Sequence, residues 1–184
     1  LRELVGQCSG WRNWALRCRH HDGSVRWLQS NASAILDEDG SLIGFRGADR
    51  DISDRVEREA RLEFLAYHNP TTGMPNRTAL RELLDARRDR GPLLAAALRL
   101  HGFYDYISSR GRGFAEQLLR AVARRLTQLL PPDAIVAHLG EQSFAFAFDI
   151  EAGRQEEGMD TVRRVERMLR EEPLDVDGEP AHVT

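Results

Sequence analysis

The chain of 184 residues has no lysine, only two cysteines and no long apolar run. All 26 basic residues are arginines, which we interpret as the codon usage of a GC-rich genome and not as mechanism. Cys8 and Cys18 have neither metal-ligand spacing nor enough partners for a disulfide scaffold, so a reducing cytoplasm is expected. Without about 20 consecutive apolar residues no membrane-spanning segment is predicted, and LRELVGQCSG at the start is no signal peptide.

The charge pattern excludes a further class of protein. The net charge is −3, and no basic run is long enough to line a nucleic-acid groove. The hydrophobic content of 41% and charged content of 30% are typical of a folded globular chain. Its length suffices for one ordinary domain or two small ones. We therefore expect a soluble globular chain that does not bind nucleic acid.

Residues 14–51 show the alternation of antiparallel strands. Apolar and basic side chains alternate in WALRCRH, and turns with a glycine at residues 21–23 and 37–40 predict two hairpins joining three strands. Three strands form half of a sheet domain. Only a short predicted helix at residues 1–6 precedes them, so the apolar face is expected to pack on a segment absent from this chain or on a partner.

A helical pattern follows at Asp51. The sequence DISDRVEREARLEFLAYHN ends before Pro70 and predicts a helix with Ser53 as its N-cap. Its apolar residues between charges are Val56, Leu62 and Leu65. We interpret this helix as a connector between two domains. A solvated surface helix and a short two-stranded coiled coil both fit the same pattern.

From residue 76 onward, predicted helices and strands alternate. Helices are predicted at 76–90 with Asn76 as the cap, at 113–130, and around 158–172. Strands are predicted at 92–100, which reads as buried, in a hairpin at 135–148, and in a final pair at 174–184. This order indicates an α/β sandwich with helices against one sheet, so the whole chain is expected to be α+β.

Residues 11–58 resemble the C-terminal half of a PAS/PAC sensor domain. The likeness is carried by RHHDGSVRWLQSNASAILDEDGSLIGFRGADRDISDR. Asp51, Ile52 and Ser53 match the D-I-T with which such domains pass into a signalling helix. The N-terminal half, which wraps most of the ligand in that family, is not in this chain. The ligand and the stimulus therefore stay unassigned.

The sequence AYHNPTTGMPNRTAL resembles the entry of a GGDEF domain, the diguanylate cyclase family, whose pattern is H-D-x-L-T-G-L-P-N-R. The residues that fit are His68, Thr72, Gly73, Pro75, Asn76 and Arg77, while Asn69 stands where an aspartate is usual. The likeness runs to the end of the chain. It implies a nucleotidyl-cyclase or palm-like fold with a ferredoxin-like core.

The sequence AHLGEQSFAFAF aligns with the R-x-G-G-D-E-F-A hairpin of that family. Gly140 and Phe144 fit the pattern. Glu141, Gln142 and Ser143 replace the second glycine, the aspartate and the glutamate. The chain therefore resembles the family at its signature hairpin with the working residues changed.

The resemblance implies a reaction in which two GTP molecules condense to cyclic di-GMP across a dimer. Magnesium, a hard cation that prefers carboxylate oxygens, neutralises the triphosphate. The family motif D-x-D-x-F-K aligns with RLHGFY, so Arg99 replaces the metal-binding aspartate, His101 the second aspartate and Tyr104 the phosphate-contacting lysine. Ser143 replaces the second metal acid. Because a guanidinium carries donors only and stays charged, no metal and no catalysis are expected.

The nucleotide pocket of the family is also altered. Ile107 stands in place of an asparagine and cannot hydrogen-bond guanine, whereas Glu116 keeps an acid but reads more simply as a surface residue. Residues 131–134, PPDA, lack the R-x-x-D of the inhibitory product site. Arg99 could contact a phosphate directly, although pairing with Glu141 is the favoured interpretation.

Three simpler interpretations compete with functional ones. His101 and His138 have no third ligand at useful spacing and are interpreted as satisfied structural histidines. Gly111 and Gly113 read as a loop before a helix more simply than as a phosphate cradle. The alternating residues interpreted as core are Phe144, Phe146 and Phe148.

Together these patterns predict half a PAS domain at residues 1–51, a connector signalling helix at 52–68, and a degenerate GGDEF domain at 69–184 that is incomplete at its C-terminal end. We expect a cytoplasmic bacterial signalling fragment, with membrane tethering through a larger protein as an alternative. No cofactor is expected in it.

Three functions remain open at this stage. The favoured one is a non-catalytic regulatory and dimerisation module coupled to a PAS sensor. The second is a GTP-binding allosteric module controlling a downstream EAL phosphodiesterase. The third is an active diguanylate cyclase, which the joint loss at Arg99 and Ser143 disfavours. The expected partners are accordingly a second copy, GTP and an EAL domain.

Overall fold

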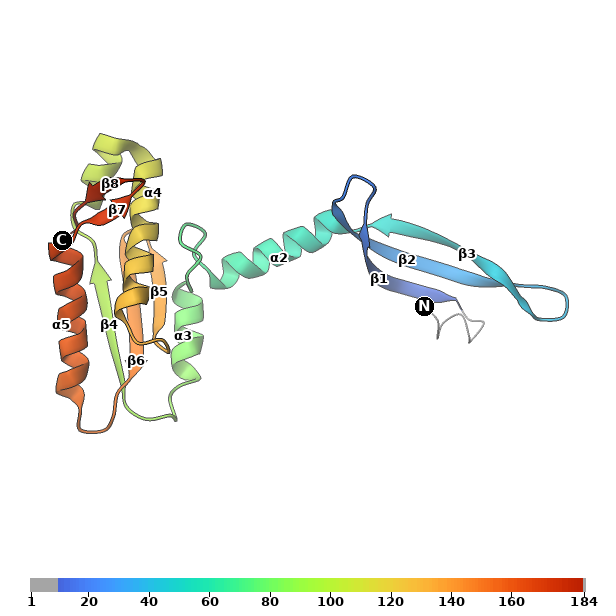
Figure 1. The fold of residues 1–184 in the computed structure, drawn as a ribbon. Coiled ribbons are helices and arrows are strands. Elements are labelled where there is room, and N and C mark those ends of the chain that lie inside the picture. Colours follow the sequence, from blue (N-terminus) through green and yellow to red (C-terminus); the bar gives the residue numbers. More distant parts are fainter. Residues whose placement is uncertain (1–9, 184) are drawn as a thin grey trace. The chain divides into compact units, whose positions relative to one another are not determined.

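A computed structural model describes residues 10–183 of the chain. The helix predicted at residues 1–6 lies outside the described residues. The chain divides into two compact units, residues 1–63 and residues 64–184, and the division falls inside helix α2 (Ser53–Tyr67) (Figure 1). Each unit is described by itself below. None of the helices in the described part is long and apolar enough to cross a membrane.

The first unit contains the three predicted strands. They are β1 (Trp11–Arg19), β2 (Val25–Leu36) and β3 (Leu42–Asp51), paired antiparallel in the order β1-β2-β3. Gly23 and Gly40 lie in the two turns with φ of 86° and 81°, a region that glycine adopts without strain. The predicted antiparallel sheet and its hairpins are therefore confirmed.

This sheet has almost no buried interior of its own. Among residues 10–63 only Ser30, Ile52 and Ser53 are buried. Trp11 packs on Phe45 at 5.1 Å between ring centroids, and its indole Nε1 donates to the Ser30 hydroxyl at 2.9 Å. The apolar side chains of the sheet are otherwise half-buried or exposed, as expected of strands that lack a covering layer.

Helix α2 is tied to the sheet at its first residues. The amide of Ile52 donates to the carbonyl of Trp27 at 2.8 Å, and the amide of Ser53 donates to Asp51 Oδ1 at 2.9 Å. The predicted N-cap role of Ser53 is wrong, because this residue is the first of the helix. Its hydroxyl accepts the amide of Trp27 at 2.9 Å, so it bonds to strand β2 and not to the helix.

The second unit is built on a three-stranded antiparallel sheet. Its strands are β4 (Leu93–Arg99), β6 (Ser143–Asp149) and β5 (Ile135–Gly140), in the order β4-β6-β5. A separate hairpin follows near the end of the chain, β7 (Leu174–Val176) with β8 (Glu179–Ala181). The prediction of a buried strand at residues 92–100 is only half right. Ala95, Ala97 and Arg99 are exposed, because helix α5 covers one face of this edge strand.

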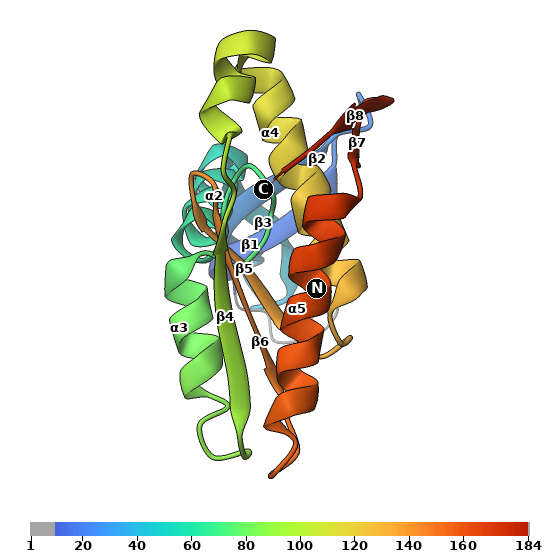
Figure 2. The same cartoon turned by 90° about the vertical axis from the view of Figure 1, so that its left-hand side faces the viewer.

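Three helices accompany this sheet: α3 (Arg77–Asp85), α4 (Phe103–Leu129) and α5 (Gln155–Glu171). Figure 2 shows α4 and α5 on one side of the sheet and α3 on the other. The predicted α+β class is confirmed. The side chain of Asn76 caps α3 as predicted, accepting from the amides of Thr78 and Ala79.

Two predicted helix boundaries are wrong. Helix α3 ends at Asp85, and the following residues form turns. Helix α4 begins at Phe103, not at Gly113, and the predicted loop is helical except for a kink at Gly111. Gly111 has φ 84° and ψ 167°, which glycine adopts readily because it has no Cβ.

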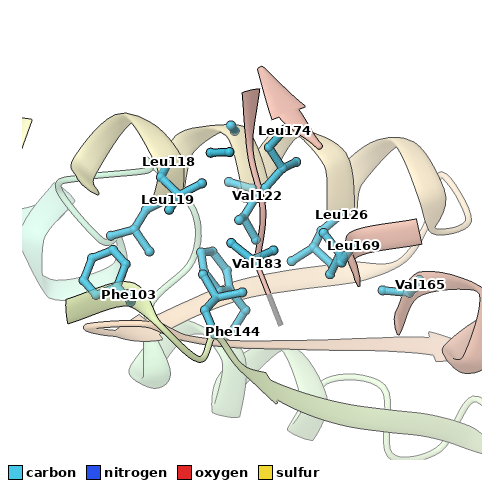
Figure 3. Packing of buried hydrophobic residues seen from close by; sticks show 14 of the residues in the cluster. Phe103, Leu118, Leu119, Val122, Leu126, Phe144, Val165, Leu169, Leu174 and Val183 are labelled. Atoms are coloured by element: carbon cyan, nitrogen blue, oxygen red, sulfur yellow. The ribbon is translucent and has the colours of Figure 1, made fainter. Parts of the chain in front are cut away.

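The core of the second unit lies between the sheet and helices α4 and α5 (Figure 3). Leu118, Val122 and Leu126 of α4 are fully buried against Phe144 of β6. Val165 and Leu169 of α5 and Leu174 and Val183 near the chain end join them. The predicted core role of the three phenylalanines at positions 144, 146 and 148 is confirmed. The alanines between them are buried too, because β6 is the central strand.

Candidate functional site

The hairpin between β5 and β6 turns over only two residues, Glu141 and Gln142. Gly140 has φ 115° and Glu141 has φ 48°, so both have positive φ, which glycine adopts without strain. Gly140 pairs with Ser143 across the turn. The carbonyl of Gln142 accepts the amide of Leu100 at 3.0 Å, which fixes the tip against the end of β4.

Arg99 lies directly beside this tip, opposite Ser143 in the register of β4 and β6. We assign the buried amide of Gln142 with its oxygen toward Arg99, since the other orientation sets donors against donors. The oxygen then accepts from Arg99 Nε at 2.8 Å and from Nη2 at 3.2 Å. The favoured pairing of Arg99 with Glu141 is wrong: no ion pair within residues 10–183 involves Arg99.

Glu141 has a different partner. Its carboxylate oxygen Oε2 accepts the phenol hydroxyl of Tyr104 at 3.4 Å. Tyr104 is 54% exposed, so this contact lies in solvent and contributes little. The two replaced residues of the turn therefore bind two replaced residues of the β4–α4 segment, Gln142 with Arg99 and Glu141 with Tyr104.

The two residues that align with the metal ligands of the family, Arg99 and Ser143, do not fit a magnesium ion. Arg99 presents only donors, and Ser143 is a neutral hydroxyl. In the described part of the chain, no three His, Cys, Asp or Glu side chains are grouped closely enough to hold a metal. Glu141 is the sole acid at the hairpin tip.

The other two residues that align with nucleotide-binding positions of the family, Ile107 and Glu116, lie on helix α4. Ile107 packs half-buried against the core cluster, so its side chain faces the protein. Glu116 accepts from Arg112 Nε at 3.0 Å, one turn earlier on the same helix. Residues 131–134 follow the end of α4 and carry no arginine. Among residues 10–183, neither Ile107 nor Glu116 makes a hydrogen bond to the hairpin tip.

The two histidines differ from each other. His138 is only 1% exposed and both ring nitrogens have partners, Thr72 Oγ1 at 3.1 Å and the carbonyl of Glu141 at 3.0 Å. Its ring stacks on Phe144 at 4.4 Å. Burial lowers the pKa of the His138 imidazole, partly offset by the bond to Glu141. The interpretation as a satisfied structural histidine is right for His138 and wrong for His101, which is exposed.

The sequence does not predict two contacts of this site, that of Thr72 with His138 and that of Gln142 with Arg99. Thr72 lies in the entry motif, yet nothing in the sequence places its hydroxyl 66 positions away against His138. Gln142 was noted as a replaced aspartate, but its contact with Arg99 depends on strand register. Only the folded sheet brings these pairs together.

An open groove adjoins the site along the outer edge of β4, which pairs with no other strand within residues 10–183. It has a volume of about 470 Å³ and lies between this edge and helix α5. Leu98 and Leu100 form one wall, and Val165 and Leu169 form the other. Val183 lines the same groove.

The match to a known family decides the assignment. The family described as "Diguanylate cyclase, GGDEF domain" matches residues 66–184. The chain belongs to the GGDEF family. It is therefore a signalling domain of the cyclic di-GMP system.

Curated relatives of this GGDEF chain are much longer than the matched segment. An uncharacterized protein of Azorhizobium caulinodans is 37% identical over 52% of this chain and 13% of its own length. The diguanylate cyclase DgcP of Pseudomonas aeruginosa is 31% identical over 65% of this chain and 18% of its own. The cyclic di-GMP phosphodiesterase PdeR of Escherichia coli is 31% identical over 51% and 15%. The chain thus spans less than a fifth of these relatives.

Solved structures agree on the fold. A diguanylate cyclase/phosphodiesterase from Caldicellulosiruptor saccharolyticus superposes with a TM-score of 0.60 at 21% identity, covering 66% of this chain and 73% of that one. A sensory box/GGDEF family protein from Caulobacter crescentus gives 0.58 at 25% identity, covering 64% and 78%. The described GGDEF fold is therefore that of known family members.

Proposed function

We propose that the chain is a non-catalytic regulatory and dimerisation module of a cyclic di-GMP signalling protein, coupled to a PAS sensor. The observation that carries the proposal is the pairing of Arg99 with Gln142 where the family holds its metal ligands. A fixed guanidinium occupies the place of one carboxylate, and Ser143 occupies the place of the other. Without a metal to neutralise the triphosphate, attack on an α-phosphate loses its main electrostatic support.

The direct test is a cyclase assay with the purified chain, GTP and either Mg²⁺ or Mn²⁺. We expect no cyclic di-GMP above a control without protein. The matched variant is Glu141→Gln, which removes the last acid of the hairpin tip. Product formed by the natural chain and abolished in this variant would contradict the proposal and support an active cyclase.

A second candidate is a GTP-binding allosteric module that controls a downstream EAL phosphodiesterase. The likeness to the phosphodiesterase PdeR and the small share of its length that is matched favour this alternative. Titration with GTP separates the two candidates. Saturable binding by the chain supports the allosteric module, and no binding supports the regulatory and dimerisation module.

The division of labour along the chain is part of the proposal. Residues 1–51 form half of a PAS domain, residues 52–68 the connector, and residues 69–184 an incomplete GGDEF domain. The unpaired outer edge of β4 and its apolar groove support the last point, because a further strand would cover both. No cofactor is assigned, the PAS ligand stays open, and a cytoplasmic location remains the expectation.

Self-association through helix α2 is the proposed means of dimerisation. Leu62 is 67% exposed and Leu65 is 39% exposed, three positions apart on one side of the helix. Phe64 and Tyr67 add exposed apolar surface to the same turns. A second α2 helix would bury these side chains, as in a short coiled coil.

A further inference from the structure

The end of helix α2 is bound to the start of helix α3 through one side chain. The Asn76 amide nitrogen donates to the carbonyls of Leu65 at 3.3 Å and Ala66 at 2.9 Å, in the last turn of α2. Its oxygen caps α3, and its backbone amide donates to the carbonyl of Tyr67 at 2.8 Å. Asn76 thus provides donors for free carbonyls at the end of α2 and an acceptor for free amides at the start of α3.

The loop between these helices is closed by its own hydrogen bonds. The amide of Asn69 donates to the carbonyl of Met74, and the amide of Gly73 donates to the carbonyl of Asn69, both at 2.8 Å. Arg120 Nε of helix α4 holds the carbonyl of Thr71 at 2.8 Å. These hydrogen bonds hold the loop in one conformation, so Thr72 moves whenever the loop moves.

His138 joins this loop to the signature hairpin. Its amide donates to the carbonyl of Pro75 at 2.9 Å, and its ring nitrogens contact Thr72 Oγ1 and the carbonyl of Glu141. A carbonyl only accepts, so Nε2 carries the proton and Nδ1 accepts the hydroxyl proton of Thr72. One tautomer of the neutral imidazole satisfies both ring partners, Thr72 and Glu141.

We propose that His138 is a positioning residue that couples the last turn of helix α2 to the tip of the signature hairpin. The bonds run from Leu65 and Ala66 through Asn76 and the entry loop to Thr72, and through the imidazole to Glu141. We call the bond between Thr72 Oγ1 and His138 Nδ1 the Thr72–His138 link. Movement of the connector helix reaches the hairpin tip within one domain along this path, whether or not nucleotide binds.

The Thr72–His138 link is the bond of this path that a single substitution can remove most cleanly. The other bonds join neighbouring parts of the loop or backbone groups, whereas this one joins side chains 66 residues apart. Cutting it leaves the His138–Phe144 stack and the bond to Pro75 in place. Loss of the link therefore breaks the side-chain route from the entry loop to the hairpin tip, while the backbone bond to Pro75 keeps the hairpin folded.

The test is a double-mutant cycle in the 184-residue chain, read by hydrogen exchange. Asn76→Asp keeps the cap on α3 but removes both donors to α2. The reporter is the Leu100 amide, which donates to the carbonyl of Gln142 at the tip. Thr72→Val cuts the link at nearly constant shape and also removes the 3.4 Å contact from the Met74 amide to the same hydroxyl. Thr127→Val is the matched control, because its hydroxyl bonds only to Ala123 on its own helix.

We expect Asn76→Asp to speed Leu100 exchange by about tenfold in the natural and Thr127→Val chains, and by less than about twofold once Thr72→Val is present. Thr72→Ser should restore the full response. Equal acceleration of Leu100 exchange with and without Thr72→Val would overturn the proposal. The proposal would also be overturned if Asn76→Asp speeds exchange of the His68 amide at the end of α2 but leaves Leu100 exchange unchanged. Ala66→Gly, which loosens the same turn while leaving Asn76 intact, repeats the cycle if Asn76→Asp fails to fold.

Discussion

At the scale of single residues, the buried imidazole of His138 makes stability depend on pH. Burial lowers its pKa below the usual value of 6.5, so between the two values the unfolded chain binds more protons than the folded one. The contribution of His138 to the free energy of unfolding should be fully present above about pH 6.5. It should fall as the pH drops from there to the lowered pKa of the folded chain.

Urea unfolding at pH 7.5 and pH 5.5 measures this effect. The matched variant is His138→Gln, which keeps a donor and an acceptor but does not titrate. The natural chain should lose more stability between the two pH values than the variant does. Equal losses in both chains would show that other groups carry the dependence.

A second prediction at this scale concerns the lost metal site. Arg99→Asp with Ser143→Glu rebuilds two carboxylates at the strand end and the hairpin, and Mg²⁺ affinity should rise. Turnover should stay absent, since Tyr104 offers no cation to phosphates and Ile107 faces the core. An unpaired polar group in a base pocket costs about 1–3 kcal/mol, and such losses multiply in a reaction that depends on positioning.

Calorimetric titration with Mg²⁺ and a cyclase assay on the same protein examine both halves of that prediction. The quadruple variant that adds Tyr104→Lys and Ile107→Asn is the comparison. Robust turnover by the double variant alone would show that the pocket has kept its binding capacity.

At the scale of one element, helix α2 exposes apolar side chains in the described part of the chain. Because Leu62 and Leu65 are exposed, replacing both with alanine should change the stability of a monomer by less than about 0.5 kcal/mol. In a dimer that buries them, each truncation should cost about 2–5 kcal/mol of the association-linked stability.

Mass measurement by analytical ultracentrifugation over a concentration series separates these cases. The matched control is Leu83→Ala on helix α3, which is also exposed. We expect the Leu62→Ala, Leu65→Ala chain to shift to lower mass while the control does not. If mass and melting temperature both stay unchanged, the helix is only a solvated spacer.

At the scale of the whole molecule, the outer edge of β4 and the groove against α5 predict a stabilising addition. On the proposal that the GGDEF domain is incomplete, a chain extended beyond Thr184 by one further strand should pair with this edge and cover the groove. For a protein of this size each 1 kcal/mol gained raises the melting temperature by about 2–4 °C. A melting temperature that does not rise on extension, or unchanged hydrogen exchange of the β4 amides, would argue that another partner covers the groove.

The sequence by itself determined the class of the fold, the two hairpin sheets and the family. These follow from local patterns: alternation in the strands, glycine in the turns, and the spacing of HNPTTGMPNR and of the signature hairpin. The core phenylalanines were predictable for the same reason, since period-two alternation places them on one face. Local patterns also placed the start of α3 at Asn76, because a cap depends on neighbours in sequence.

Only the tertiary structure decided which replaced residues meet. Strand register sets Arg99 beside Gln142 and leaves Glu141 to Tyr104, and no pattern within either segment specifies that choice. The local sequence indicates that Ser53 caps the helix. In the folded sheet its hydroxyl instead accepts the Trp27 amide of β2. The Thr72–His138 link likewise depends on two segments folded against each other. Hydrogen bonds between distant side chains are set by packing geometry, which a linear sequence does not encode locally.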